Sequence, residues 1–332
     1  MRAVLCTKLG SPQDLTIEEI AAPVPGADEV VVAVRACGVN FPDLLVVQGK
    51  YQAQPPLPFS PGGDFSGVVE RTGARAADFS PGDRVCGNVG TGAFREKIAV
   101  PAAQLTRLPD QVDMTLAGSF LTTYGTSLYA LRERGALQSG QSLLVLGAGG
   151  GVGLAAVEIG VSLGARVIAA ASSDEKLAAA QRAGAHEIVK YPANLSERAQ
   201  QKEFGAALKQ TAGSAGFDVI YDPVGGGYSD PALRSIGWQG RYLVVGFAAG
   251  AIPSIPLNLV LLKGCQIVGV IWGASWQHDI NIKASIHSEL VRMLAGGQIR
   301  PHVAAVLPLE RAADALRMLA ERQVVGKIAL RP

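Results

Sequence analysis

The chain shows two patterns of hydrophobic residues, and the pattern changes near residue 120. Residues 1–119 carry short valine-rich runs, such as 29–35 and 67–71, punctuated by Pro-Gly turns. That pattern predicts a small, mostly antiparallel β domain. Further along, short apolar runs without alternation are separated by segments with helical periodicity, which predicts strands buried on both faces of a parallel sheet. The six strands expected there are 143–146, 167–170, 187–189, 219–221, 242–245 and 266–271.

These elements predict an α/β protein with two domains. The strands and their intervening helices describe a doubly wound parallel sheet within residues 120–272. After residue 272 the pattern changes again, and we expect residues 273–332 to return and complete the mostly-β domain of residues 1–119. The elements expected in that returning segment are a helix near 280–294, a strand near 303–306, a helix near 309–321 and an end strand at 326–330.

A glycine-rich turn follows the first strand of the predicted parallel sheet. Five of the seven residues 147–153 are glycine, and helical periodicity begins at Leu154. A strand, a glycine turn and a helix place the free N–H groups of a helix N-terminus against a pyrophosphate. Read back from Gly153, the G-x-G-x-x-G register puts Ala148 at the first glycine, so a glycine loop without a ligand is the alternative. The residues expected at the phosphates are Gly150, Gly151 and Val152.

The end of the second strand indicates which dinucleotide binds. A site for NAD usually ends this strand with Asp or Glu, which hydrogen-bonds the ribose 2′-hydroxyl. Here the strand ends at Ala171, followed by Ser172, Ser173 and Lys176, which suit a 2′-phosphate. Asp174 argues slightly against a phosphate, but at the start of a helix it can serve the helix dipole. We therefore expect NADPH rather than NADH, with a solvated helix lysine as the alternative for Lys176.

Composition and charge exclude several classes of protein. With 48% hydrophobic and 17% charged residues over 332 positions, the chain can bury large cores. A net charge of +2 without a dense basic run argues against nucleic acid as a partner. No segment has the apolar length of a membrane span. The four cysteines lack C-x-x-C spacing, so we expect free thiols in a cytoplasmic protein; they are Cys6, Cys37, Cys86 and Cys265.

Several spaced motifs resemble the medium-chain dehydrogenase/reductase superfamily, and within it the zinc-independent quinone oxidoreductase branch. The motifs are Ala36–Asp43 (ACGVNFPD), Pro81–Val85 (PGDRV), Ala148–Gly153 (AGGGVG) and Tyr221–Gly225 (YDPVG). The similarity runs nearly end to end, from Met1 to the segment Gly326–Leu330. The resemblance implies a GroES-like, mostly-β catalytic domain and a Rossmann-type doubly wound parallel sheet.

The resemblance also implies where zinc would bind in the superfamily's alcohol dehydrogenases. At the matching positions this chain has Asn40, Gly63 and, approximately, Gly118. A catalytic zinc needs three ligands from Cys, His, Asp or Glu, so we expect none here. Without a Lewis acid, alcohol oxidation loses several kcal/mol of charge stabilisation. Hydride addition to a conjugated acceptor remains feasible, and quinones, enones and enoyl thioesters fit that requirement.

Three residues of the first domain are the catalytic candidates that the resemblance implies. Asn40 and Asp43 form the Asn-x-x-Asp pair that lines the cleft beside the nicotinamide in this branch. The alternative for Asn40 is an ordinary turn asparagine, and the alternative for Asp43 is a structural hydrogen-bond acceptor. Tyr51 corresponds to a tyrosine associated with proton donation in enoyl reductases, or it is an aromatic lid on the pocket. Gln52 replaces the proline that usually follows this tyrosine.

The resemblance implies further contacts to the cofactor. The residues concerned are Thr122, Tyr191, Gly246, Phe247, Val270, Trp272 and Lys327. Gly246 and Phe247 follow a strand at its carboxyl end, where α/β sheets bind ligands. Lys327 is expected to touch the cofactor phosphate, with a solvated edge-strand lysine as the alternative.

The prediction for function is an NADPH-dependent, zinc-independent quinone oxidoreductase. An NADPH-dependent enone or 2-enoyl-thioester reductase is the closest alternative, and a crystallin-like NADPH-binding protein with little catalysis is another. The apolar run 261–271 is expected to form an edge strand that needs cover. Because the corresponding strand pairs across a two-fold axis in this superfamily, we expect a homodimer.

Overall fold

The computed structural model describes residues 1–278 and 280–332, with the side chains of residues 276–280 outside the description. The chain forms two compact units. The first unit contains Met1–Thr123, Trp276–Gly297 and Pro301–Pro332, and the second contains Tyr124–Ser275 and Gln298–Arg300. The sequence placed the divisions after residues 119 and 272, and the contacts divide the chain after residues 123 and 275. No described helix is long and apolar enough to cross a membrane.

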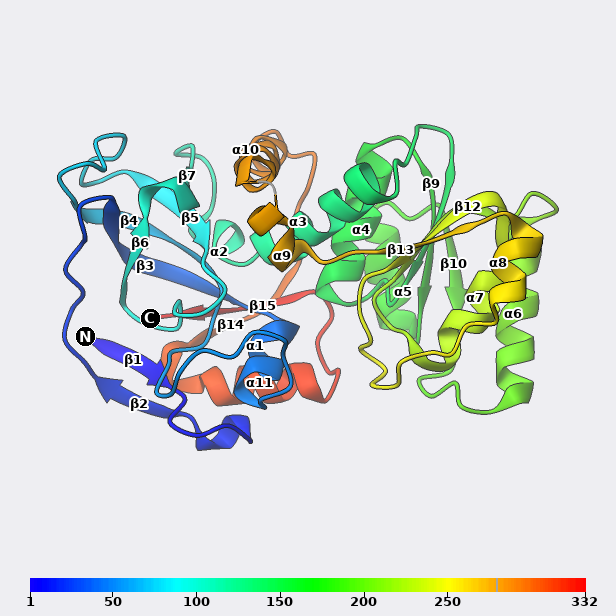
Figure 1. The fold of residues 1–332 in the computed structure, drawn as a ribbon, viewed down its shortest axis with the longest axis horizontal. Coiled ribbons are helices and arrows are strands. Elements are labelled where there is room, and N and C mark those ends of the chain that lie inside the picture. Colours follow the sequence, from blue (N-terminus) through cyan, green and yellow to red (C-terminus); the bar gives the residue numbers. More distant parts are fainter. Residues whose placement is uncertain (279) are drawn as a thin grey trace. The chain divides into compact units, whose positions relative to one another are not determined.

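The second unit is built on the predicted doubly wound sheet (Figure 1). Its six strands are all parallel and lie in the order β10-β9-β8-β11-β12-β13, so the chain starts in the middle and winds outward in both directions. The strands are β8 (Ser142–Leu146), β9 (Arg166–Ala171), β10 (Glu187–Lys190), β11 (Phe217–Asp222), β12 (Ile236–Val244) and β13 (Gln266–Gly269). The crevice at the point where the winding reverses is the place where such sheets bind ligands.

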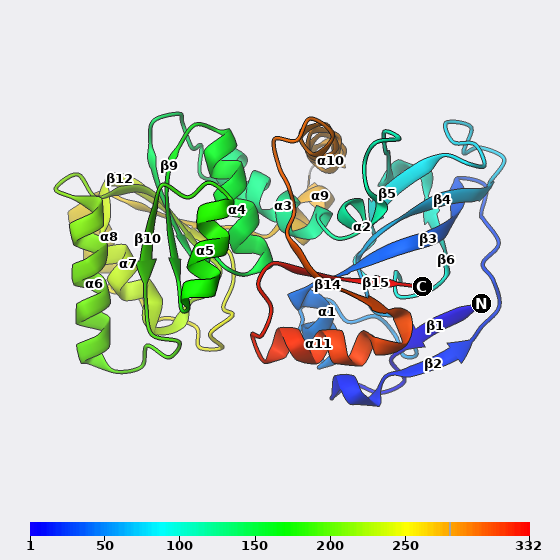
Figure 2. The ribbon, with the colours of Figure 1, turned by 180° about the vertical axis from the view of Figure 1, so that it is seen from behind.

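Helices cover both faces of this sheet. Side chains of successive strand residues point to opposite faces. Leu144 and Ile168 belong to the core that also contains α6 and α7 side chains, whereas a Cβ at Gly160 of α4 would meet Leu143 and Val167. Figure 2 shows α4 and α5 side by side. The helices are α4 (Gly151–Ser162), α5 (Asp174–Arg182), α6 (Arg198–Ala212), α7 (Ser229–Arg234) and α8 (Leu257–Lys263).

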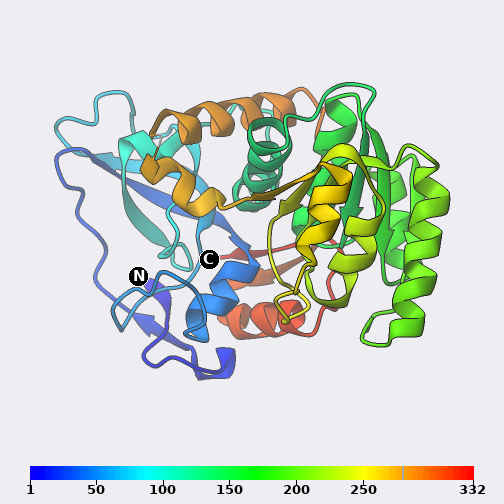
Figure 3. The same ribbon diagram turned by 45° about the vertical axis from the view of Figure 1, so that its right-hand side comes forward.

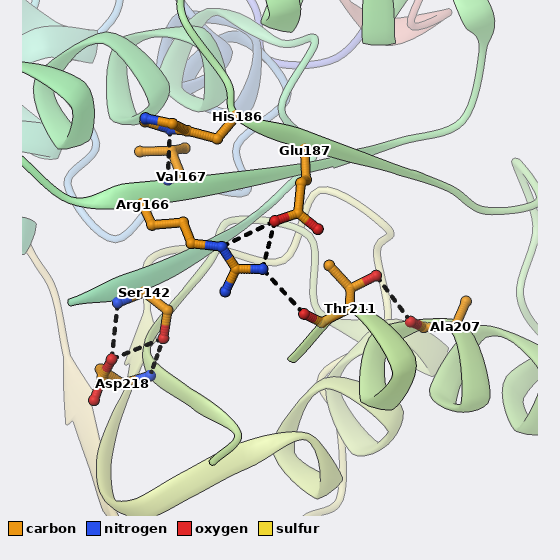
Figure 4. A network of polar contacts seen from close by, with 8 residues as sticks. All are labelled: Ser142, Arg166, Val167, His186, Glu187, Ala207, Thr211 and Asp218. Atoms are coloured by element: carbon orange, nitrogen blue, oxygen red, sulfur yellow. Dashed lines mark hydrogen bonds and ion pairs between the residues drawn. The ribbon is translucent and has the colours of Figure 1, made fainter. Parts of the chain in front are cut away.

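Polar contacts join neighbouring strands near their amino ends (Figure 4). The backbone N–H and the hydroxyl of Ser142 both donate to Asp218 Oδ2, at 2.8 and 2.7 Å, which joins β8 to β11. Arg166 Nε donates to Glu187 Oε1 at 2.9 Å and so joins β9 to β10. These contacts leave the carboxyl ends of the strands for binding.

The first unit is organised around a mixed sheet of mostly antiparallel strands (Figure 1). Its order is β14-β15-β3-β4-β5-β7, with β6 paired to β3. Of these pairs, β14 and β15 run parallel and the others antiparallel. The strands are β3 (Glu29–Val39), β4 (Asp64–Thr72), β5 (Arg84–Asn88), β6 (Lys97–Pro101), β7 (Leu105–Arg107), β14 (Val303–Pro308) and β15 (Lys327–Arg331); β1 (Arg2–Leu5) pairs with β2 (Thr16–Glu19).

The core of the first unit is rich in valine, as the pattern of its strands predicts. Val30, Val32 and Val34 of β3 pack in one cluster with Leu316 of α11. Figure 3 shows blue α1 beside red α11, and the two helices are in contact. The remaining helices are α1 (Phe41–Val47), α2 (Met114–Ala117), α3 (Leu121–Leu128), α9 (Trp272–His278), α10 (Ile280–Ala295) and α11 (Ala312–Ala320). A π-helix, Tyr129–Arg134, continues α3.

The apolar run 261–271 was predicted to be one edge strand, but it contains the end of a helix and a shorter strand. Its first residues end helix α8, which terminates at Gly264. Gly264 has a left-handed φ of +56°, the conformation in which glycine ends many helices. The strand β13 occupies only Gln266–Gly269 and pairs with β12, so on the described chain it ends the sheet. Apolarity alone could not separate helix from strand in this run.

Candidate active site

A buried carboxylate, Asp64, is the hub of a polar cluster in the first unit. Its side chain is 0% exposed. It accepts hydrogen bonds from Thr122 N at 3.0 Å, Thr122 Oγ1 at 2.8 Å, Asn88 Nδ2 at 2.7 Å and Asn40 Nδ2 at 3.1 Å. A buried charge is stable only when it is paired or hydrogen-bonded in this way. We call these four residues, together with Asp43 and Lys327, the Asp64 cluster.

Helix α1 positions two members of the cluster. Asn40 is the N-cap of α1, and Asp43 is the third residue of the helix. Asn40 N donates to Asp43 Oδ2 at 2.7 Å, which satisfies one of the N–H groups that a helix start leaves open. Of the alternatives from the sequence, the structure thus gives Asn40 a capping position in a buried network. Lys327 reaches the same place from β15, where Lys327 Nζ donates to Val39 O at 2.9 Å and to Asn40 Oδ1.

Burial perturbs the charges of this cluster. Burial raises the pKa of Asp43 to about 7, and the nearby charge of Asp64 adds to the rise, while the hydrogen bond from Asn40 and the charge of Lys327 oppose it. Burial lowers the pKa of Lys327, and the two carboxylates oppose that change. Because the effect of burial outweighs the opposing hydrogen bond and lysine charge, Asp43 binds a proton near neutral pH.

Tyr51 lies at the edge of this unit's core and is partly buried. Burial raises its pKa, and the charge of Asp43 raises it further. The phenol of Tyr51 and the carboxyl group of Asp43 therefore interact electrostatically. A raised pKa keeps the phenol protonated and makes it a weaker acid than free tyrosine.

The sequence did not identify three residues of this arrangement. Asp64 follows a Pro-Gly turn at residues 61–63, and Asn88 and Lys283 belong to no motif. Lys283 Nζ of α10 donates to Asn88 O at 2.7 Å, and burial lowers its pKa to about 8. The one available signal was a charged residue, Asp64, directly before the apolar strand 65–69. Contacts between residues so far apart in the chain produce no periodic pattern in the sequence.

Lys327 is not a solvated lysine on an edge strand, so this one of the two interpretations from the sequence is wrong. Strand β15 lies between β14 and β3, not at an edge, and Lys327 is only 4% exposed.

In the second unit, the glycine loop has the shape that a dinucleotide requires. Gly147 has a left-handed φ of +63°, and a Cβ at Gly153 would come within 2.2 Å of Gly147 O. Gly150 is the N-cap of α4 and has no side chain. The first N–H groups of the helix therefore have no side-chain acceptor at the N-cap position. A Cβ at Gly150 would meet only Gly147 O, at 3.5 Å. The loop therefore fits a bound phosphate at Gly150, Gly151 and Val152.

Of the four further cofactor candidates near this loop, Lys176 and Tyr191 contact it directly. A Cβ at Gly149 would lie 2.4 Å from the Cβ of Lys176, so the lysine stem rests on the loop. Tyr191 Oη accepts a hydrogen bond from Gly147 N at 3.2 Å. Ser173 Oγ accepts from Lys176 N at 3.3 Å as the N-cap of α5, and its own O–H hydrogen remains for a ligand. Ser172 follows β9 at the carboxyl end of that strand.

Asp174, the acid that argued against a phosphate, is paired. Lys190 Nζ, at the end of β10, lies 2.7 Å from Asp174 Oδ2. The register places Lys190 beside Ala171, the last residue of β9. The ammonium of Lys190 thus lies against the carboxylate that would disfavour a 2′-phosphate.

The remaining cofactor candidates also lie at carboxyl ends of strands in the second unit. Gly246 and Phe247 follow β12, and Val270 follows β13. Trp272 is buried, and its ring centroid lies 5.6 Å from that of Tyr129. Asn40, Asp43, Thr122 and Lys327 are thus brought together in the first unit, and the loop, lysine and tyrosine candidates in the second.

The positions that hold zinc in the alcohol dehydrogenases carry poor metal donors here. Asn40 is engaged with Asp64 and Lys327, and Gly63 and Gly118 have no side chains. A Cβ at Gly118 would come within 2.6 Å of Ala36 O, so a ligand side chain at that position would clash with β3. Within the described residues, no group of three His, Cys, Asp or Glu side chains could hold a metal ion.

Comparison with known families matches most of the chain. The family described as "Alcohol dehydrogenase GroES-like domain" matches residues 26–110, and the family described as "Zinc-binding dehydrogenase" matches residues 151–285. These matches confirm the predicted combination of a GroES-like domain with a Rossmann-type sheet.

Individual proteins give the same result. The chain is 39% identical to quinone oxidoreductase-like protein 2 of Mus musculus over 99% of this chain and 91% of the mouse protein. The Escherichia coli quinone oxidoreductase, solved in complex with NADPH, superposes with a TM-score of 0.89 at 26% identity and covers both chains completely. A mycobacterial protein, also solved with NADPH, superposes with a TM-score of 0.90 at 29% identity, again over both whole chains. The chain therefore belongs to the quinone oxidoreductase branch of the medium-chain dehydrogenase/reductase superfamily.

Proposed function

We propose that this protein is an NADPH-dependent oxidoreductase that transfers hydride to a quinone without a catalytic zinc. The observation that carries the proposal is the donor set of the first unit. Asn40, Gly63 and Gly118 stand where metal ligands would be needed, while the glycine loop of the second unit keeps the features of a dinucleotide site. Hydride addition to a quinone spreads charge over the conjugated acceptor, so it needs no Lewis acid.

The second unit supplies the cofactor site in this proposal. The N–H groups at Gly150, Gly151 and Val152 bind the pyrophosphate at the positive end of α4. The hydroxyls of Ser172 and Ser173 and the ammonium of Lys176 bind the 2′-phosphate through charge-assisted hydrogen bonds. NADPH, when bound, supplies the hydride. Two related structures contain NADPH, which supports this cofactor.

The first unit supplies polar groups and a proton. Reduction of a quinone to a hydroquinone takes one hydride and one proton. Asp43 is the better of the two acids because its pKa is about 7, whereas the pKa of Tyr51 is raised above its usual value. Asp43 therefore holds the proton at neutral pH, Asn40 presents its carboxamide to the acceptor, and Tyr51 lines the pocket.

We also propose a homodimer formed through the second unit, in a reducing compartment such as the cytoplasm. Strand β13 has β12 on one side, and its other edge lies open on the described chain. Leu257, Leu261 and Leu262 of the neighbouring helix α8 are 70–80% exposed. A sheet edge beside apolar side chains favours pairing with a second copy. The four cysteines are buried free thiols, which supports a reducing compartment.

Steady-state assays test the reaction and separate its alternatives. NADPH and NADH are each offered with benzoquinone, phenanthrenequinone and crotonyl-CoA as acceptors. The proposal predicts turnover of both quinones with a lower KM for NADPH than for NADH. Faster turnover of crotonyl-CoA would support the enoyl-thioester reductase instead. Tight NADPH binding without turnover of any acceptor would support an NADPH-binding protein.

A further inference from the structure

Lys327 is a lysine in the interior of the first unit, and the local backbone fixes its direction. Gly326 precedes it with a left-handed φ of +84°, and a Cβ there would lie 2.4 Å from His302 O. Only glycine fits that turn. Lys327 N then donates to His302 O at 2.8 Å, which starts strand β15. Because Ile328 belongs to the apolar core cluster, the alternation of the strand points Lys327 to the other face of the sheet.

The sheet register places Lys327 next to Asn40. Ile328 pairs with Val39 in the antiparallel ladder of β15 and β3. One further step along both strands brings Lys327 opposite Asn40, and its ammonium reaches Asn40 Oδ1 and Val39 O. Lys327 and Asn40 are far apart in the sequence, so their contact depends on the closing of this sheet.

The charges on either side of Asn40 fix its carboxamide in one orientation. The amide oxygen faces the ammonium of Lys327, and the amide nitrogen donates to the carboxylate of Asp64 at 3.1 Å. A rotated amide would set an NH2 group against an ammonium and an oxygen against a carboxylate, and both contacts would repel. The second N–H hydrogen of Asn40 remains available for a ligand.

We propose that Lys327 is a positioning residue that acts through Asn40 and is not a ligand of the cofactor phosphate. Its ammonium holds the Asn40 carboxamide in the orientation that the reaction uses. This proposal rests on the proposed reductase function, because turnover is one of its readouts. The charged groups that face Lys327 are the carboxylates of Asp43 and Asp64, and Lys283 faces Asp64 from α10.

The two roles of Lys327 predict different kinetic changes. A ligand of the phosphate contributes to cofactor affinity, so its loss raises the Kd for NADPH. A residue that orients Asn40 leaves that affinity unchanged, and its loss lowers kcat. Lys176→Met provides the contrast, because Lys176 rests on the glycine loop and is proposed to bind the phosphate directly.

The experiment compares Lys327→Met, Asn40→Ala, the double variant and Lys176→Met in the full-length protein. NADPH binding is measured by fluorescence titration, and kcat is measured with phenanthrenequinone. We expect Lys327→Met and Asn40→Ala each to lower kcat about tenfold or more, and the double variant to lose no more than the worse single variant, because residues in one network are not additive. The Kd for NADPH changes less than about twofold in Lys327→Met but rises in Lys176→Met. Multiplicative losses in the double variant, or a raised Kd in Lys327→Met, would overturn the proposal.

A second variant and a second signal keep the proposal testable if Lys327→Met does not fold. Lys327→Arg keeps the charge in a different geometry. In protein labelled with 15N-asparagine, the side-chain amide signals of Asn40 are identified by their loss in Asn40→Ala. The proposal predicts that these signals shift in Lys327→Arg, and unshifted signals contradict it. This measurement needs no turnover, so it separates failure of the proposal from failure of the reductase function.

Discussion

At the scale of single residues, the first unit depends on one buried carboxylate. Asp64 accepts hydrogen bonds from the side chains of Asn40 and Asn88 and from both the backbone and the hydroxyl of Thr122. Each of these groups donates, so the centre must be an acceptor that carries no hydrogen on either oxygen. An ionised aspartate meets that requirement, and an asparagine does not.

Asp64→Asn is therefore expected to destabilise the protein. Its NH2 group would face the donors of Asn40 and Asn88, and buried donors would lose their partner. We expect a loss of about 3 kcal/mol in the free energy of unfolding, measured by urea denaturation. Asp110→Asn is the matched control, because the side chain of Asp110 is fully exposed, and a change below about 0.5 kcal/mol is expected. Equal stability of the two variants would contradict the role of Asp64.

The raised pKa of Asp43 predicts a dependence of stability on pH. The unfolded chain loses the proton of Asp43 near pH ~3.9, whereas the folded protein keeps it up to a pKa of about 7. Between these values the folded state binds more protons, so this group makes stability fall as pH rises. Asp43→Asn keeps an acceptor for Asn40 N and removes the titration.

Urea denaturation at a series of pH values measures this effect. The stability of the native protein relative to Asp43→Asn should decrease as pH rises through that window and then level off above about pH 7. A relative stability that stays constant or increases across the window would show that Asp43 does not titrate as described.

At the scale of elements, the glycine loop joins strand β8 to helix α4 and prepares the helix start for a phosphate. Gly153 lets the first turn of α4 approach Gly147 O closely. The side chain of Lys176 packs against Gly149, which brings the start of α5 to the same loop. The proposed phosphate site thus relies on close backbone approach as well as on charged side chains.

Gly153→Ala is expected to damage cofactor binding. Its Cβ would come within 2.2 Å of Gly147 O, so either the loop or the helix must move. We expect the Kd for NADPH to rise about tenfold or more, which corresponds to ~1.4 kcal/mol of binding free energy. Gly205→Ala in α6 is the control, because its Cβ meets nothing closer than 3.6 Å and alanine favours a helix interior. Unchanged affinity in Gly153→Ala would contradict the proposed phosphate site.

The sequence predicted these elements well because their signals are local. The six strands of the parallel sheet and the glycine turn can each be recognised from a window of about ten residues. The Asp64 cluster could not be predicted in this way, because Lys327 and Asn40 meet only when β15 pairs with β3. The end of α8 at Gly264 also escaped prediction, since an apolar run suits a helix and a strand alike.

At the scale of the whole molecule, a shared fold does not by itself define the reaction. The chain matches a family described as zinc-binding, yet the three positions in question carry Asn40, Gly63 and Gly118. The proposed difference in chemistry therefore rests on a few side chains within one fold, and the proposed assembly rests on a surface elsewhere on the chain.

The proposed homodimer predicts a change of mass on substitution of α8. Leu261→Glu combined with Leu262→Glu places two charges on the exposed apolar face, and we expect a monomer by light scattering coupled to size-exclusion chromatography. Val24→Glu is the control, because Val24 is 76% exposed in the first unit. A protein that is monomeric before substitution, or a dimer that persists in the double variant, would refute this interface.

In the proposed reaction, hydride passes from NADPH to a quinone with no help from zinc. The most direct measurement is the rate of NADPH oxidation by phenanthrenequinone in protein that has been stripped with a chelator and analysed for metal content. We expect an unchanged rate in protein that contains no stoichiometric zinc. A rate that collapses on stripping and returns when zinc is added would contradict it.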